Sequence, residues 1–319
     1  MIPVITIQGP TAVGKSALAL QLAEELNSEI ISADSRQVYK LLNIGTAKPS
    51  REEQEKIKHH LIDIVYPDQN YSAGDFAKDA FHVIKNLNEH NKIPIIVGGT
   101  GFYIQSLVEG IFDAPDISPE IRINLKQTAI EKGTEFLYER LKKIDPDSAE
   151  RTEPNDLNRV IRALEVYEAT GKTITQHWQQ QVTHKKIIQA FNIFISDDRD
   201  ALYERINKRV DAMLEKGLLQ EMNELLKIGY GENDHGMNTV GYKELFPFFS
   251  KEKKLEECIE EIKKHTRNYA KRQFTWFRKI DFDLTLQVNK ITFLNVLEKI
   301  LEFYEIYSDR RWDDHCQNK

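Results

Sequence analysis

The chain has 319 residues, 40% of them hydrophobic, which suits one large domain carrying an insertion or two modest domains. No stretch approaches the roughly 20 apolar residues that cross a bilayer, and no charged signal segment precedes Val4, so we expect a cytoplasmic protein without a membrane partner. Two cysteines, Cys258 and Cys316, are too few for a disulfide framework or a four-thiolate zinc site, and a net charge of -6 counts against nucleic-acid binding over the whole surface.

A glycine-rich turn lies between a predicted strand at 4–8 and a predicted helix at 16–26. It consists of Gly9, Pro10, Thr11, Ala12, Val13, Gly14, Lys15 and Ser16, which fits the pattern G-x-x-x-x-G-K-[ST]. In such a loop the backbone N–H groups turn inward around phosphate oxygens, the lysine adds a positive charge and the serine hydroxyl can ligate Mg²⁺. The sequence therefore predicts a phosphate loop, with Ser16 as its magnesium ligand.

Two further corners follow predicted strands at 29–33 and 93–97. Asp34 follows the first of them, and Gly98-Gly99-Thr100-Gly101 follows the second. Because open α/β sheets bind ligands at the carboxyl ends of their strands, we expect both corners to face the crevice beside the phosphate loop. Asp34 taken alone could instead cap a helix or hold Mg²⁺ through water. Two corners in one crevice predict a site for more than one substrate.

The remaining elements complete an α/β fold with a parallel sheet of the P-loop NTPase type, flanking helices and a helical insertion domain. Further strands are predicted at 60–64, 187–195 and 282–288, and a long amphipathic helix at 200–228 that ends in the Gly229 turn. Residues 116–186 are charge-rich and helical in pattern. We therefore predict a catalytic core made of 1–115 and 187–319, interrupted by a helical insertion domain at 116–186.

A basic and aromatic segment lies at 263–279. It reads KKHTRNYAKRQFTWFRK and contains no acid. Such a mixture supplies cations for phosphates and rings that stack on bases. A surface helix packed through Phe274 and Phe277 is the alternative, and both interpretations can hold together.

Eight segments along the chain resemble, in order, those of the tRNA dimethylallyltransferase family. The N-terminal ones are GPTAVGKS, ISADSRQVYKLLNIGTAKP, HHLIDIVYPDQNYSAGDF and IIVGGTGFYIQSL; the later ones are LNRVIRALEVYEATGK, LYERINKRVDAMLEKGLLQEM, NTVGYKE and RNYAKRQFTWFRK. The resemblance runs from about Val4 to Arg278. It implies a prenyltransferase that moves a dimethylallyl group from dimethylallyl diphosphate to the N6 amine of the adenosine 3′-adjacent to the anticodon. The implied partner is a tRNA anticodon stem-loop, and the implied cofactor is Mg²⁺.

This resemblance gives the site residues their expected roles. The diphosphate should bind the N–H groups of the phosphate loop and Lys15, with Thr11 as a hydroxyl donor. Asp34 is the expected general base that accepts the amine proton, and Thr100 completes the reacting site. Arg209 resembles the family arginine that reaches the diphosphate, and Arg205, one turn earlier, is the competing candidate.

A target base stacked in the anticodon loop has to flip into the pocket to react. The residues expected to contact tRNA form a pocket group, an insertion group and a C-terminal group. They are Asp34, Ser35, Arg36, Gln37 and Thr100; Arg122, Asn158, Arg159 and Arg162; and Asn238, Gly241, Tyr242, Lys271, Arg272, Gln273, Trp276 and Arg278. The family usually carries Gln where this chain has Asn158, which puts that contact in doubt.

Three other functions fit parts of the pattern. An adenylate isopentenyltransferase would run the same chemistry on free nucleotides, but it has no use for the insertion and the basic segment. A P-loop small-molecule kinase fits the phosphate loop alone, and a noncatalytic RNA-binding module would not need Asp34 beside it. We expect a monomer, because no heptad pattern or long apolar stripe requires a partner.

Overall fold

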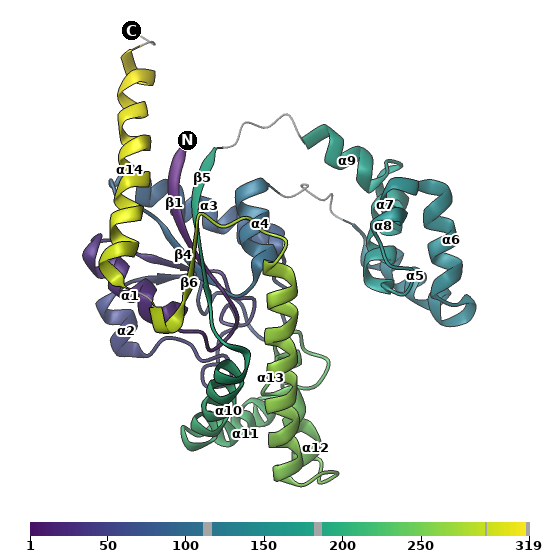
Figure 1. The fold of residues 1–319 in the computed structure, drawn as a ribbon. Helices are drawn as coiled ribbons and strands as arrows, with labels where there is room; N and C mark the ends of the chain where they lie inside the picture. Colours follow the sequence, from purple (N-terminus) through teal and green to yellow (C-terminus); the bar gives the residue numbers. More distant parts are fainter. Residues whose placement is uncertain (111–116, 182–186, 291, 317–319) are drawn as a thin grey trace. The chain divides into compact units, whose positions relative to one another are not determined.

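The computed structural model describes residues 1–110, 117–181, 187–290 and 292–316 of the chain (Figure 1). Two compact units divide it: Met1–Gly110 with Lys186–Lys319, and Ile111–Lys185. Within the described ranges, no helix is both long enough and apolar enough to cross a membrane.

The first unit is built on one parallel sheet of six strands, in the order β3-β2-β4-β1-β5-β6. The strands are β1 (Ile2–Gln8), β2 (Ile30–Ser32), β3 (His59–His60), β4 (Ile95–Gly98), β5 (Ile188–Ser196) and β6 (Leu284–Gln287). In the central strand β1, Ile5 lies opposite Ile95 of β4 and Phe191 of β5. The predicted parallel sheet is confirmed, including its extension by the two strands from far along the chain.

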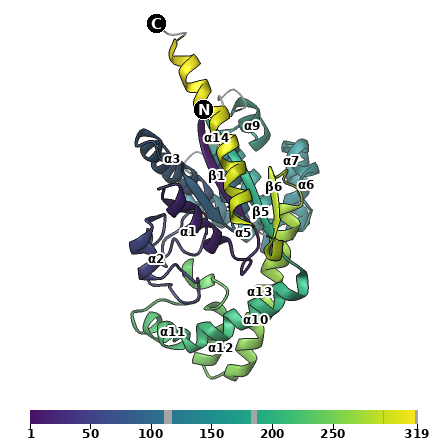
Figure 2. The same ribbon diagram turned by 60° about the vertical axis from the view of Figure 1, so that its left-hand side comes forward.

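Helices cover both faces of this sheet (Figure 2). Since side chains alternate along a strand, Ile5 and Ile7 of β1 enter one core while Val4 enters the other. The first core includes residues of α1 and α14, and the second includes residues of α3 and α4. These helices are α1 (Lys15–Glu25), α3 (Ala73–Glu89), α4 (Gly101–Glu109) and α14 (Phe293–Cys316).

A further group of helices packs below the sheet in the view of Figure 1, around a core of its own. It consists of α10 (Arg199–Glu215), α11 (Leu218–Lys227), α12 (Phe246–Phe249) and α13 (Leu255–Phe277). The short elements of the unit are α2 (Arg51–Lys56), η1 (Gly236–Asn238), η2 (Lys243–Leu245) and η3 (Val288–Lys290).

Two predicted elements differ from the structure. The single helix predicted at 200–228 is wrong, because it is broken between α10 and α11 at Gly217, whose φ of 99° takes the chain out of the right-handed helix. The strand predicted at 60–64 is also too long. β3 ends at His60, since Leu61 and Asp63 have positive φ angles that no strand accepts.

The second unit is helical. Its helices are α5 (Pro119–Lys132), α6 (Thr134–Ile144), α7 (Pro146–Glu150), α8 (Leu157–Thr170) and α9 (Ile174–Gln181). They share an apolar core in which Val160, Ile161 and Leu164 are buried. The buried Asp145 accepts hydrogen bonds from the Ser148 and Thr175 backbones, so its carboxylate ties α7 to α9.

The break at Gly217 can be tested directly. Gly217→Ala forces a side chain into the left-handed region, and we expect the free energy of unfolding to fall by about 1 kcal/mol. Urea denaturation measures this change. The matched control is Gly231→Ala, where φ is not positive and an added Cβ would meet nothing within 4 Å. We expect a change within about 0.5 kcal/mol there, and equal losses in both variants would contradict the explanation.

Candidate active site

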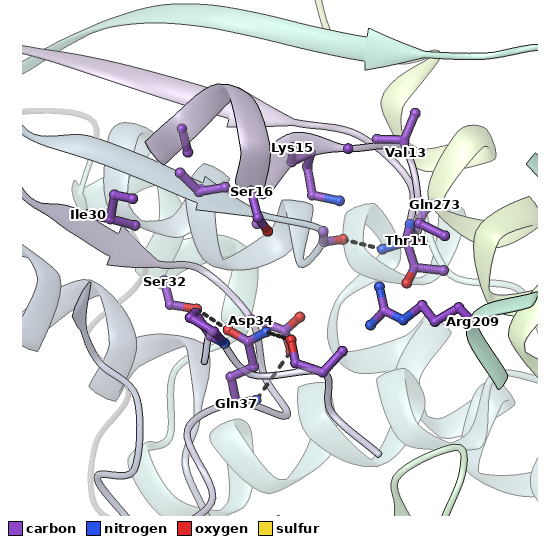
Figure 3. A pocket seen from close by; sticks show the side chains of 18 of the residues that line it. Thr11, Val13, Lys15, Ser16, Ile30, Ser32, Asp34, Gln37, Arg209 and Gln273 are labelled. Atoms are coloured by element: carbon purple, nitrogen blue, oxygen red, sulfur yellow. Dashed lines mark hydrogen bonds between the residues drawn. The ribbon is translucent and has the colours of Figure 1, made fainter. Parts of the chain in front are cut away.

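A pocket of about 420 Å³ lies in the first unit, at the carboxyl ends of β1, β2 and β4 (Figure 3). Its wall comes from the phosphate loop, the segments after β2 and β4, and helices α10 and α13. The polar lining residues are Thr11, Lys15, Ser16, Ser32, Asp34, Gln37, His59, Arg205, Lys208, Arg209, Tyr269 and Gln273. In Figure 3, Thr11 and Lys15 lie on one side and Asp34 and Gln37 on the other.

The phosphate loop connects β1 to α1 as predicted, and Lys15 is the first residue of that helix. The Lys15 ammonium donates hydrogen bonds to the carbonyls of Gly9 (3.0 Å) and Pro10 (2.7 Å) of its own loop. Burial lowers the pKa of Lys15 to about 7, with Asp34 opposing and Arg209 adding to this effect. The lysine is thus folded back on carbonyl dipoles, which a bound phosphate group would replace.

Asp34 and Thr100 come together beside this loop. Asp34 Oδ1 accepts hydrogen bonds from the backbone N–H groups of Arg36 (2.8 Å) and Gln37 (3.4 Å). Thr100 Oγ1 accepts one from the Ser35 N–H (3.1 Å), so the corner after β4 is joined to the corner after β2. Within the described residues, Asp34 Oδ2 has no hydrogen-bond partner, and this oxygen is available to a ligand.

The structure separates the two candidate arginines of α10. Arg205 donates to the Ala12 carbonyl (3.1 Å) and pairs with Asp197, so its guanidinium is used in bracing the phosphate loop. Arg209 extends into the pocket (Figure 3), where burial lowers the pKa of its guanidinium and Asp34 opposes that shift. In the described part of the chain Arg209 has no ion-pair partner within 4.0 Å. It is therefore the arginine that is free to meet an anion.

Gln273 has a different role from the one predicted. Its side chain is only 6% exposed; Oε1 accepts from the Thr11 N–H (2.9 Å) and Nε2 donates to the Gly99 carbonyl (2.9 Å). Both ends of the amide are used inside the protein. Gln273 thus supports the pocket by joining the phosphate loop to the corner after β4.

The other residues of the first unit that we expect to contact tRNA are partly buried or bonded within the protein and partly exposed. Tyr242 and Gly241 are buried, and the Tyr242 side chain packs in the core of the α10–α13 helices. The Gln37 amide is held by Ser32, Thr46 and Ala47. The residues that are exposed or half-buried are Ser35, Arg36, Asn238, Lys271, Arg272, Trp276 and Arg278.

The insertion group lies in the second unit. Arg122 and Arg162 both approach the buried carboxylate of Glu165, at 3.6 and 2.7 Å, and Arg159 pairs with Asp156 at 3.2 Å. Asn158 is exposed at the start of α8. These side chains form a group of their own on α5 and α8.

Some pocket residues were not predicted. Tyr269 lines the pocket one turn before Gln273 on α13, and burial together with the charge of Asp34 raises its pKa to about 12. The spacing of four residues to Gln273 was the available signal, because it puts both on one helix face. His59 also lines the pocket, and burial lowers its pKa.

Known proteins match this chain over most of its length. The model of the family described as IPP transferase matches residues 37–280. The chain is 46% identical to the tRNA dimethylallyltransferase of Caldanaerobacter subterraneus subsp. tengcongensis over 95% of this chain and 97% of that protein. It is 48% identical to the tRNA dimethylallyltransferase of Carboxydothermus hydrogenoformans, over 93% and 96% of the two chains.

Solved structures of similar transferases also match this chain over most of its length. The tRNA delta(2)-isopentenylpyrophosphate transferase of Staphylococcus epidermidis matches with a TM-score of 0.68 and 39% identity, over 96% of this chain and 99% of that one. A eukaryotic dimethylallyltransferase acting on tRNA matches with a TM-score of 0.77 and 34% identity, over 90% of this chain and 74% of that one.

The lowered pKa of Lys15 predicts how anion binding depends on pH. Only the protonated lysine attracts a diphosphate, so above about pH 7 the free protein must take up a proton to bind it. We expect the advantage of the wild type over Lys15→Met, expressed as the ratio of their dissociation constants for inorganic diphosphate, to fall by up to about tenfold per pH unit above pH 7. Calorimetric titrations from pH 6 to 9 measure this ratio, in which the titration of diphosphate itself cancels. A ratio that stays constant with pH would contradict the assignment.

Proposed function

The chain belongs to the IPP transferase family, and from this premise we propose that it transfers a dimethylallyl group from dimethylallyl diphosphate to tRNA. The acceptor is the N6 amine of the adenosine 3′-adjacent to the anticodon, and diphosphate is released. The observation that carries the proposal is that a phosphate loop, the free guanidinium of Arg209 and the carboxylate of Asp34 line one pocket. A phosphate loop alone fits many reactions, whereas a carboxylate opposite it fits proton removal from a second substrate.

The cationic side of the pocket suits the leaving group. As the C–O bond to diphosphate breaks, negative charge grows on the departing oxygen and positive charge on the allyl carbons. Lys15, Arg209 and the N–H groups of the loop stabilise the first of these charges. The Thr11 hydroxyl can donate to the diphosphate as well. The Thr11 backbone N–H cannot, because it already donates to Gln273.

The acidic side suits the acceptor. The amine lone pair forms the new C–N bond while diphosphate departs with the electrons of the old one, and the amine must then lose a proton. Oδ2 of Asp34 accepts that proton, and the two N–H groups that bind Oδ1 hold the carboxylate in place. Thr100, joined to Ser35, limits where the adenine edge can lie.

Mg²⁺ is the cofactor that we propose for the prenyl donor. Magnesium in phosphate sites is bound by one or two protein oxygens, and phosphate oxygens and water complete its shell. The exposed Ser16 hydroxyl on the pocket wall fits that need. When bound, the ion would neutralise charge on the diphosphate.

We further propose that α13 and the second unit contact the anticodon stem-loop. Lys271 and Arg272 of α13 and Arg278 directly after it are exposed cations, and Trp276 packs edge-on against the exposed Phe102 at 6.1 Å. In the second unit, Arg122, Asn158, Arg159 and Arg162 offer groups that suit phosphates. We propose that the enzyme acts as a cytoplasmic monomer.

The central test replaces the proposed base. With Mg²⁺, labelled dimethylallyl diphosphate and an anticodon stem-loop, we expect Asp34→Asn to slow transfer by about 10²–10⁴-fold, because the amide cannot accept the proton. Binding of inorganic diphosphate should persist, since the phosphate loop is intact. The matched control is Asp68→Asn, an exposed acid outside the pocket, which should transfer at the wild-type rate.

Offering AMP and ATP as acceptors separates the rivals. Label on free nucleotides in preference to the stem-loop would overturn the tRNA assignment in favour of an adenylate isopentenyltransferase. If the wild type transfers label to no acceptor, the tRNA assignment fails, and a kinase assay would test the small-molecule kinase function instead. Undiminished transfer by Asp34→Asn would remove Asp34 as the base.

The second unit gives a separate prediction. Arg159 is exposed, so Arg159→Gln should weaken stem-loop binding and reduce the slope of log affinity against log salt by about 1. Filter binding across salt concentrations measures both. The control Arg140→Gln removes an arginine of the same unit that pairs with Glu168 at 2.7 Å, and its slope should equal that of the wild type. An unchanged slope for Arg159→Gln would exclude a phosphate contact there.

A further inference from the structure

A carboxylate on α11 holds a loop that forms part of the pocket wall. The Glu221 carboxylate accepts hydrogen bonds from the consecutive backbone N–H groups of Asn43 (3.0 Å), Ile44 (3.0 Å) and Gly45 (3.5 Å). Consecutive N–H groups that converge on one anion form a strong, directional site. The loop 43–47 is therefore anchored from α11, far away in the sequence.

Tyr242 completes this anchor. Its hydroxyl donates to Glu221 at 2.5 Å and accepts from the Gly45 N–H at 3.0 Å, while its ring is fully buried. A Cβ on Gly45 would lie 2.4 Å from that ring, so only glycine allows the loop to approach so closely. Burial, and next the charge of Glu221, raise the pKa of Tyr242 well above its ordinary value, which keeps the hydroxyl protonated as a donor.

The anchored loop in turn fixes the Gln37 side chain. Gln37 Nε2 donates to the carbonyls of Thr46 (3.4 Å) and Ala47 (3.2 Å), and Oε1 accepts from the Ser32 hydroxyl (2.9 Å). Gln37 lines the pocket, and its backbone N–H binds the Asp34 carboxylate. A displacement of the loop 43–47 would thus move the residue beside Asp34.

We propose that Glu221 and Tyr242 are positioning residues for the acceptor side of the active site, acting through the loop 43–47 and Gln37. The inference rests on the function proposed above. The phosphate loop has supports of its own in Gln273 and Arg205, so the anchor acts on the acceptor side and leaves the prenyl-donor side unchanged.

The test removes one hydroxyl. Tyr242→Phe keeps the buried ring but removes the hydroxyl that accepts from the Gly45 N–H and donates to Glu221. We expect kcat for the stem-loop to fall about tenfold, and the dissociation constant for inorganic diphosphate to change less than about twofold. Hydrogen exchange should be faster at the amides of the loop 43–47. The matched control is Tyr71→Phe, which removes a hydroxyl bonded to Asp79 (3.0 Å) in the same unit and should leave kcat unchanged.

A double-mutant cycle with Gln37→Ala identifies the route. If the anchor acts through Gln37, then Tyr242→Phe should cost less than about twofold in kcat once Gln37 is Ala. A full tenfold loss in that background, or a lower melting temperature with kcat unchanged, would overturn the proposal. A wild type that transfers nothing to RNA would instead overturn the proposed function, and the exchange and diphosphate measurements would still test the anchor.

Discussion

The side-chain amide of Gln273 is the contact on which the shape of the pocket depends. It joins the Thr11 N–H of the phosphate loop to the Gly99 carbonyl of the corner after β4, with both bonds at 2.9 Å. An amide is suited to this position because it has a donor and an acceptor at one end of a side chain, whereas a carboxylate would repel the Gly99 carbonyl. The distance between the phosphate loop and the corner after β4 is therefore set by α13, whose Gln273 lies 262 residues after Thr11 and 174 after Gly99.

The pocket buries two cations, Lys15 and Arg209, together with Asp34. Lys15 and Arg209 both have lowered pKa values because they are buried, and Asp34 opposes both shifts. Two cations placed close together out of water are costly, and a diphosphate between them would supply the missing negative charge. Binding of an anion between them would therefore relieve an electrostatic cost that the fold carries. It would also raise the proportion of protonated Lys15.

The sequence alone predicted the site residues that directly follow a strand. The phosphate loop, Asp34 and Thr100 each follow a strand directly, and the carboxyl ends of parallel strands meet at one edge, so their convergence could be predicted. It was insufficient where a role depends on a distant partner. Gln273, Tyr269 and Tyr242 all lie in segments that could have been surface or core, and only the packing of α13 and the loop 43–47 decides between these roles. The single helix predicted at 200–228 failed for the same reason, since Gly217 is tolerated inside a helix and marks a break only when tertiary contacts require one.

The break at Gly217 allows α10 and α11 to support different parts of the pocket wall. α10 carries Arg205 and Arg209 toward the phosphate loop, and a continuous helix would carry the next turns onward in the same direction. Because the chain turns at Gly217, α11 follows a new direction, and its Glu221 meets the N–H groups of Asn43, Ile44 and Gly45. The two helices thus support two parts of the pocket wall, α10 the phosphate loop through Arg205 and α11 the loop 43–47 through Glu221. In the transfer proposed above, both substrates have to be held before they react, and supports from two consecutive helices would suit that requirement.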